Sequence, residues 1–172
     1  AAVAAVAPEA GGPPAQVEGA ARAVAAAMVQ AAGLALGGTL VLAFLVLRRV
    51  RLVAAILLPL MLAGAVTLAA SVLLGLPFNY ANVIVLPLMI GVGVDAGIHL
   101  ALRSDAAAAV GDTSTPRAVL ASALTTIAAF GTLALSDHRG TASMGLMLTI
   151  AMAASVAMIF ALTPWLVRLG RR

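Results

Sequence analysis

The sequence predicts an all-α membrane protein built as a bundle of five transmembrane helices. Of its 172 residues, 63% are hydrophobic and only 9% are charged, whereas a soluble domain carries about 25% charged residues. The apolar residues gather in five stretches, each near the ~20 residues that cross ~30 Å of hydrocarbon. Lipid must therefore surround most of the chain. The absence of cysteine excludes a disulfide framework and a thiolate metal site, and no metal or other cofactor is expected.

The chain divides into a short N-terminal segment and one membrane domain. Residues 1–18 are rich in Ala, Gly and Pro, and they predict a linker or the remnant of a periplasmic domain. The membrane domain covers residues 19–172 and opens with an Ala-rich helical lead-in. Its transmembrane helices are expected at about 30–47, 52–74, 80–102, 118–135 and 143–167.

Each break between these helices has a local cause. The run from Arg48 to Arg51 interrupts the first two helices. Gly75 tolerates the left-handed conformation that closes a helix, and Pro77 prevents its continuation. Thr115 is expected as the N-cap of the fourth helix, with Pro116 at its first position. Residues 136–140 form a very short hairpin before the fifth helix.

The arginines predict the orientation of the bundle, because cytoplasmic loops carry an excess of positive charge. If the helices alternate in direction, Arg22 and Arg139 lie on one side of the membrane. The other eight arginines lie on the opposite side, which places the N-terminus in the periplasm and the C-terminus in the cytoplasm of a bacterial inner membrane. Those eight are Arg48, Arg49, Arg51, Arg103, Arg117, Arg168, Arg171 and Arg172. No basic face with interleaved aromatic residues exists, so nucleic-acid binding is not expected.

The third helix carries the residues that are best suited to chemistry. Asp95 is the only carboxylate within the five predicted spans. A charged Asp near the bilayer centre costs roughly 2.5–3.5 kcal/mol, so such residues usually serve a function. Because desolvation disfavours the charged form of a carboxyl group, a residue in this position can bind and release protons. His99 lies one helical turn away and can pass protons or adjust Asp95, although hydration at the headgroup level is an equal alternative.

Helical geometry predicts the surroundings of these groups. Gly91, Asp95 and His99 share one stripe, whereas Gly93 and Gly97 lie nearly opposite. Glycines four residues apart allow a second helix to approach closely, and Gly91, Gly93 and Gly97 are expected to serve helix packing. Neither side favours lipid, so this helix is predicted to be central.

The fourth helix offers hydroxyl groups at a matching depth. Thr125 and Thr126 are expected near Asp95, because the third and fourth helices run antiparallel. Together with Asp95 and His99, they form the predicted proton relay. The alternative for each threonine is a hydrogen bond to the preceding turn of its own helix.

Two motifs resemble the RND superfamily, in particular its MMPL branch and the hopanoid-associated RND transporters of bacterial inner membranes. The first runs from Asn79 to Ile84 and continues through Leu86-Pro87-Leu88, Gly91-Val92-Gly93-Val94-Asp95 and Gly97-Ile98-His99. The second runs from Ala121 to Gly131 and on to Gly140. The likeness covers about residue 20 to the end.

The resemblance implies one half of an RND-type, sterol-sensing-domain-like transmembrane domain, namely the last five of twelve helices. The expected partners are protons, membrane lipids, a hydrophobic substrate, and the N-terminal half and periplasmic porter domains that would complete the protein. The resemblance does not decide whether the protein forms a homo-oligomer. The implied function is proton-driven export of hopanoid-like lipids or other hydrophobic compounds. In this family a carboxylate at the position of Asp95 belongs to the proton relay, but Ala96 stands where many relatives have a second Asp or a Tyr.

Three alternatives remain. A protein-translocation accessory of the same superfamily would usually carry paired acidic residues after this helix, whereas Arg103-Ser104-Asp105 is followed by four alanines. A sterol-sensing-like module would bind lipid without pumping. An intramembrane aspartyl protease needs two facing aspartates, and only one span contains an aspartate. The chain is therefore not expected to be an enzyme.

Overall fold

Long helices make up almost all of the described chain. The computed structural model describes residues 13–76, 84–106 and 114–169, which contain no strand. All five helices there are long and apolar enough to cross a membrane, so the predicted all-α membrane bundle is confirmed. They are α2 (Pro13–Leu47), α3 (Val50–Leu73), α4 (Val85–Ala106), α5 (Ser114–Leu133) and α6 (Arg139–Leu169).

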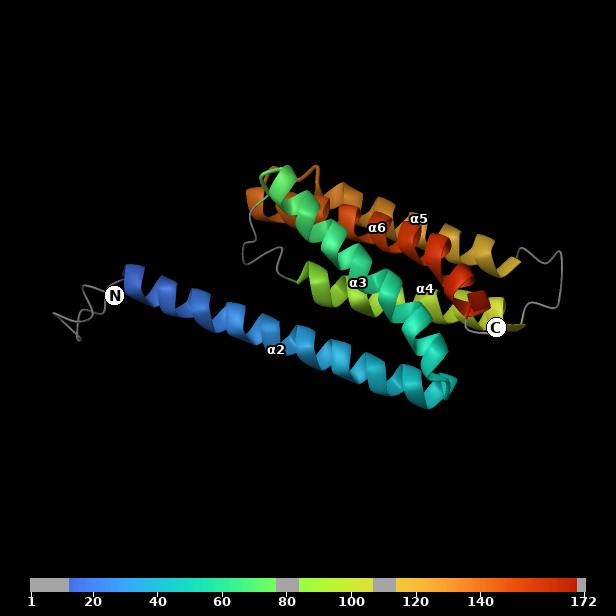
Figure 1. Cartoon of the computed structure of the whole chain (residues 1–172). Helices are drawn as coiled ribbons and strands as arrows, with labels where there is room; N and C mark the ends of the chain where they lie inside the picture. Colours follow the sequence, from blue (N-terminus) through green and yellow to red (C-terminus); the bar gives the residue numbers. More distant parts are fainter. Residues whose placement is uncertain (1–12, 77–83, 107–113, 170–172) are drawn as a thin grey trace.

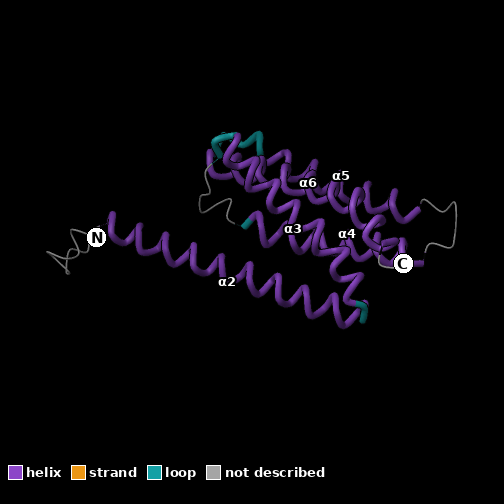
Figure 2. The backbone as a smooth tube through the Cα atoms, viewed as in Figure 1, coloured by secondary structure: helices purple, strands orange, loops and turns teal. Residues whose placement is uncertain are grey.

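Successive helices run in opposite directions, so the first and last described ends lie at opposite ends of the bundle (Figure 1). The predicted central position of the third span is confirmed, because α4 packs against each of the other four helices. Helix α6 packs against α3, α4 and α5, whereas α2 contacts only α3 and α4. The smooth backbone trace shows α2 along one side of this group (Figure 2).

The first helix begins closer to the N-terminus than the sequence predicts. Helix α2 begins at Pro13, inside the segment 1–18 that was expected to be a linker. Proline is tolerated in the first turn, because the amides there have no helical acceptor. Residues 1–12 lie outside the described residues. The 35 residues of α2 correspond to about 52 Å at 1.5 Å per residue, which exceeds the ~30 Å of hydrocarbon.

Other boundaries shift by a few residues. Helix α4 begins at Val85 rather than at residue 80, and residues 77–83, which include the first five residues of the first motif, lie outside the described residues. Helix α5 begins at Ser114, so Pro116 occupies the third position of the first turn rather than the first. Helix α6 is longer at both ends than the predicted span 143–167.

Two residues in the left-handed conformation close helices. Gly75 has φ +62°, which confirms the predicted glycine closure of α3. There the amide of Leu76 donates to the carbonyl of Ser71 at 2.9 Å, and the Ser71 hydroxyl donates to the carbonyl of Leu76 at 2.6 Å. Arg48 has φ +49° in the two-residue connection between α2 and α3. Its amide still donates to the Phe44 carbonyl at 2.8 Å, so the chain reverses direction directly after α2.

The interior consists of two buried apolar clusters, one near each end of the bundle. One contains Ile56 and Leu60 of α3 with Ile159 of α6, and the other contains Met89 of α4 with Met147 of α6. Large apolar side chains also cover the outside. Contiguous apolar surface of this kind is rare on soluble monomers, and here it provides the contact with lipid. The most exposed are Leu73, Leu135, Val72, Leu34, Val29 and Val50.

A buried hydrogen bond joins α3 and α6 at a proline. Pro59 lies inside α3 and has no amide hydrogen, so the carbonyl of Ala55 loses its usual helical donor. The hydroxyl of Thr163 on α6 donates to that carbonyl at 3.1 Å. Thr163 is fully buried. The bond therefore satisfies an acceptor that the proline left without a partner.

Candidate functional site

A pocket of about 440 Å³ lies where α4, α5 and α6 meet. It extends from Ser114 and Thr115, in the first turn of α5, to Thr126. The twelve residue steps from Ser114 to Thr126 correspond to about 18 Å of helix. The pocket therefore reaches from the end of the bundle that carries the arginines at the start of α3 toward the middle of α4.

Asp95 and His99 both line this pocket from α4. Asp95 lies near the middle of α4, closer to the centre than the predicted span 80–102 implied. Its Oδ1 is 3.5 Å from Nε2 of His99, so the two form an ion pair when the histidine is protonated. Their side chains are 79% and 60% exposed, respectively. The α4 stripe that carries Asp95 and His99 is thus open to the pocket rather than enclosed by these five helices.

The glycines of α4 differ sharply in their surroundings. A Cβ atom on Gly97 would lie 2.7 Å from Cγ2 of Ile56, and one on Gly93 would overlap Cδ2 of Leu60. Both positions lie where α4 packs on α3, and Gly93 also lines the pocket. A Cβ atom on Gly91 would meet nothing within 4 Å, so this glycine has no packing partner among the described residues.

The two threonines also differ. Thr126 lines the pocket with Asp95, whereas Thr125 is exposed and is not among the lining residues. The Thr125 and Thr126 hydroxyls both donate to the carbonyl of Ser122, at 2.7 and 3.0 Å. This is the local hydrogen bonding that is common for such residues within membranes. The structure therefore places Asp95, His99 and Thr126 around one pocket and leaves Thr125 outside it.

Helix α6 contributes a wall that the sequence did not predict. Met152, Ser155 and Ile159 face the pocket with the spacing of one helical face. Ser155 is buried, and its hydroxyl donates to the Ala151 carbonyl at 2.8 Å. The spacing of two small residues, Ala151 and Ser155, four positions apart is the only sequence signal for this wall. The rotation of α6 about its axis could not be inferred from them.

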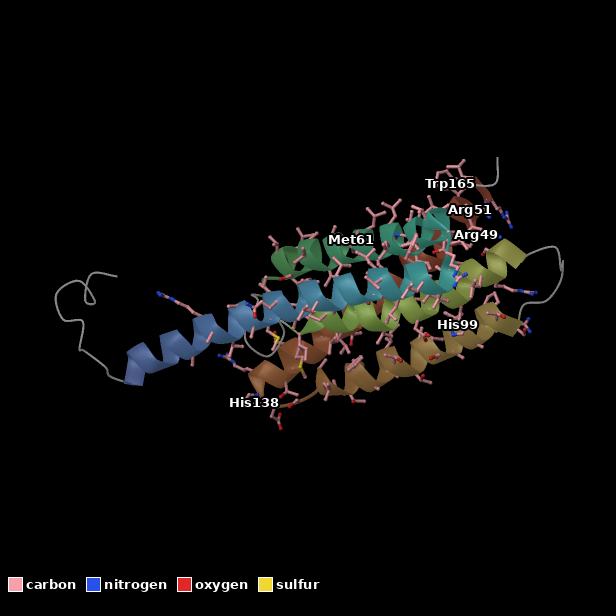
Figure 3. The ribbon with its side chains drawn as sticks, turned by 90° about the horizontal axis from the view of Figure 1, so that it is seen from below. Arg49, Arg51, Met61, His99, His138 and Trp165 are labelled. Carbon is pink, nitrogen blue, oxygen red and sulfur yellow. The ribbon has the colours of Figure 1, made fainter. Side chains whose placement is uncertain are left out.

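Figure 3 shows the distribution of charge along the bundle. Arg49, Arg51 and Trp165 lie together at one end, His138 lies at the other, and His99 lies between them. The pocket thus belongs to the half of the bundle that carries the basic end.

A bundle of membrane-spanning helices with a carboxylate at mid-depth beside a pocket has the construction of a membrane transporter. No family model matches the chain. It is 43% identical, over 143 residues and 82% of its length, to the hopanoid transporter HpnN of Rhodopseudomonas palustris. It is also 40% identical, over 152 residues and 88% of its length, to the hopanoid transporter HpnN of Burkholderia multivorans.

These relatives confirm the resemblance to the hopanoid-associated RND transporters that the two motifs predicted. The chain is a multi-pass membrane protein related to these hopanoid transporters. It spans only 16% and 17% of the lengths of the two relatives.

Proposed function

We propose that the chain is the membrane part of a proton-driven exporter of hopanoid-like lipids or other hydrophobic compounds. Asp95 is its central proton carrier. The observation that carries the proposal is the placement of Asp95 and His99 at the inner end of the pocket between α4, α5 and α6. The names of the two relatives supply the class of substrate.

The pocket suggests how protons move. Its outer end lies at Ser114 and Thr115, on the basic side of the bundle, which the arginines assign to the cytoplasm. Water in the pocket would connect Asp95 with that side. A proton that Asp95 receives from the periplasmic side would leave through His99 and this pocket, with Thr126 on its wall. The relay thus consists of Asp95, His99 and Thr126, and Thr125 contributes only if α5 rotates.

The proposal includes the orientation and the partners. The N-terminus lies in the periplasm and the C-terminus in the cytoplasm of a bacterial inner membrane. The open face of α4 is completed by further helices of the same transporter, because a carboxylate at mid-depth is costly next to lipid. Periplasmic domains of the complete protein would receive the lipid.

The substitution Asp95→Asn tests the central claim. It keeps the size and polarity of the side chain but removes the titratable group, so export should fall to the level of cells without the transporter. The measurement is the hopanoid content of separated inner and outer membranes, with the variant introduced at the native locus. Proton uptake by proteoliposomes containing the complete transporter provides a second readout.

Asp137→Asn is the matched control, because Asp137 is exposed in the turn between α5 and α6. This variant should export like the wild type. If the Asp95→Asn variant is produced at normal levels and also exports normally, proton coupling through Asp95 is wrong. The non-pumping, sterol-sensing-like module would then be the better description.

A further inference from the structure

A second cavity lies on the outer surface of the bundle, between the first half of α3 and the end of α6. It is a groove of about 580 Å³. It shares no lining residue with the pocket around Asp95. Its walls are apolar except at Arg51, the one charged residue that lines it. The main apolar residues are Leu57, Leu58 and Met61 of α3 and Leu166 and Leu169 of α6.

The basic end of this groove favours an anion. Arg51 lies in the first turn of α3, two residues after Arg49, and Arg168 lies in the last turn of α6. Positive side chains oppose the dipole at a helix N-terminus, where anions are favoured. The first turn of α3 has no acidic residue, and its N-cap residue, Arg49, forms no side-chain capping hydrogen bond. An anionic group at this position would interact with both the arginines and the backbone amides.

The neighbouring tryptophan indicates the depth of this end. Trp165 precedes the groove residue Leu166 and is 57% exposed. Figure 3 shows it close to Arg51 at the end of the bundle, with Met61 farther along α3. Exposed Trp in membrane proteins is typical of the headgroup level. The arginines would thus meet lipid phosphates, and the groove from Leu57 to Met61 would continue into the acyl-chain region.

We propose that this groove is a binding site for one anionic phospholipid of the cytoplasmic leaflet. The phosphate is bound by Arg51 and the start of α3, and an acyl chain lies along Leu58, Met61 and Leu166. Basic recesses between membrane helices on the cytoplasmic side commonly bind such headgroups. The site is separate from the proton relay, so this inference does not depend on Asp95.

The single tryptophan of the chain allows a direct test. The chain is reconstituted in phosphatidylcholine bilayers that contain a small fraction of brominated lipid, which quenches nearby tryptophan fluorescence. Brominated phosphatidylglycerol should quench Trp165 at a mole fraction about fivefold lower than brominated phosphatidylcholine. This factor corresponds to the usual contribution of one arginine near a membrane surface. Soluble glycerol phosphate should not relieve the quenching, because the site requires the acyl chains.

Two pairs of variants locate the site. Arg51→Gln should make the two lipids equally effective, whereas Arg139→Gln, at the opposite end of the bundle, should keep the preference. Ala54→Leu fills the groove and should abolish the preference, whereas Ala65→Leu, on the exposed side of α3 outside the groove, should not.

The proposal is overturned if wild-type protein shows no preference for the anionic lipid. It is also overturned if Arg139→Gln lowers the preference as much as Arg51→Gln, because general surface charge would then explain the effect. A preference that survives Ala54→Leu would place the lipid elsewhere. Since Ala54 is exposed and lies at the groove surface, this variant retains a decisive readout even if Arg51→Gln fails to fold.

Discussion

At the scale of single residues, Thr163 and Pro59 form a pair across two helices. A proline in the middle of a helix removes a hydrogen bond, and in lipid the freed carbonyl finds no water. Thr163 supplies the missing donor for Ala55 from the neighbouring helix. The same buried bond joins α6 to α3 at this level of the bundle.

Thr163→Val should therefore destabilise the bundle by about 1 kcal/mol. This value lies between the ~0.6 kcal/mol average for hydrogen bonds between membrane helices and the ~1–3 kcal/mol for an unsatisfied buried group. The free energy of unfolding can be measured by titration with a denaturing detergent, followed by circular dichroism.

Two variants distinguish this explanation from a simple packing effect. Thr149→Val should cost little, because the Thr149 hydroxyl donates to the Gly145 carbonyl of its own helix at 2.8 Å. In a Pro59→Ala background, which restores the amide of residue 59, Thr163→Val should become nearly harmless. An equal loss in both backgrounds would contradict the pairing.

The sequence indicates single residues well only when their chemistry is unusual where they stand. Asp95 could be selected because no other predicted span holds a carboxylate, and it does line a pocket. The role of Thr163 could not be predicted, because its acceptor Ala55 is 108 residues away. Thr125 and Thr126 are adjacent in sequence, but about 100° of helical rotation separates them. Only the packing of α5 shows which of them faces Asp95.

At the scale of elements, the contact between α3 and α4 depends on the absence of side chains at Gly93 and Gly97. At Gly97 the facing residue is Ile56, whose β-branched side chain has little rotamer freedom. The polar stripe occupies the other side of α4. One helix therefore combines close packing with an open face around Asp95. Gly97 does not line the pocket, so a substitution there tests the packing separately from the pocket.

Gly97→Ala should destabilise the bundle by about 1–3 kcal/mol, the usual cost of overpacking a well-filled interface. Gly91→Ala should be neutral or should stabilise the bundle by up to about 1 kcal/mol, because alanine is the better helix former and the site is open. Thermal unfolding in detergent gives the comparison. Ile56→Ala should rescue Gly97→Ala by making room for the new methyl group. If Gly91→Ala proves the more damaging change, the close contact is not at Gly97.

The existence and number of the helices were predictable, because long apolar runs between breakers have few alternatives in lipid. The residues at which these helices begin and end were less predictable. The Ala-, Gly- and Pro-rich composition of residues 1–18 predicts a linker, yet Pro13 and Pro14 begin α2, since proline fits the first turn of a helix. Helix α5 begins before Thr115 for the same reason, with Pro116 inside its first turn.

At the scale of the whole molecule, the alternation of five helices separates the described ends. The basic connection between α2 and α3 and the turn between α5 and α6 lie at opposite ends of the bundle, as Arg49 and His138 show in Figure 3. The proposed orientation, which follows the positive-inside rule, has the arginine-rich end in the cytoplasm.

Labelling of introduced cysteines tests this orientation, and the lack of native cysteine keeps the background low. A membrane-impermeant maleimide added to spheroplasts should label the D137C variant and leave the R49C variant unlabelled. Inverted membrane vesicles should reverse the result. Labelling of R49C in intact spheroplasts would show that the assignment of the two sides is wrong.

The open side of Asp95 also has a consequence for biochemistry on the isolated chain. Its carboxylate would meet hydrocarbon whenever the chain stands alone in a bilayer, at a cost of roughly 2.5–3.5 kcal/mol. Two molecules can remove that cost by turning α4 toward α4. Dimers seen after overproduction of this segment alone would then reflect the removal of Asp95 from lipid. They would not show the stoichiometry of the transporter in the cell.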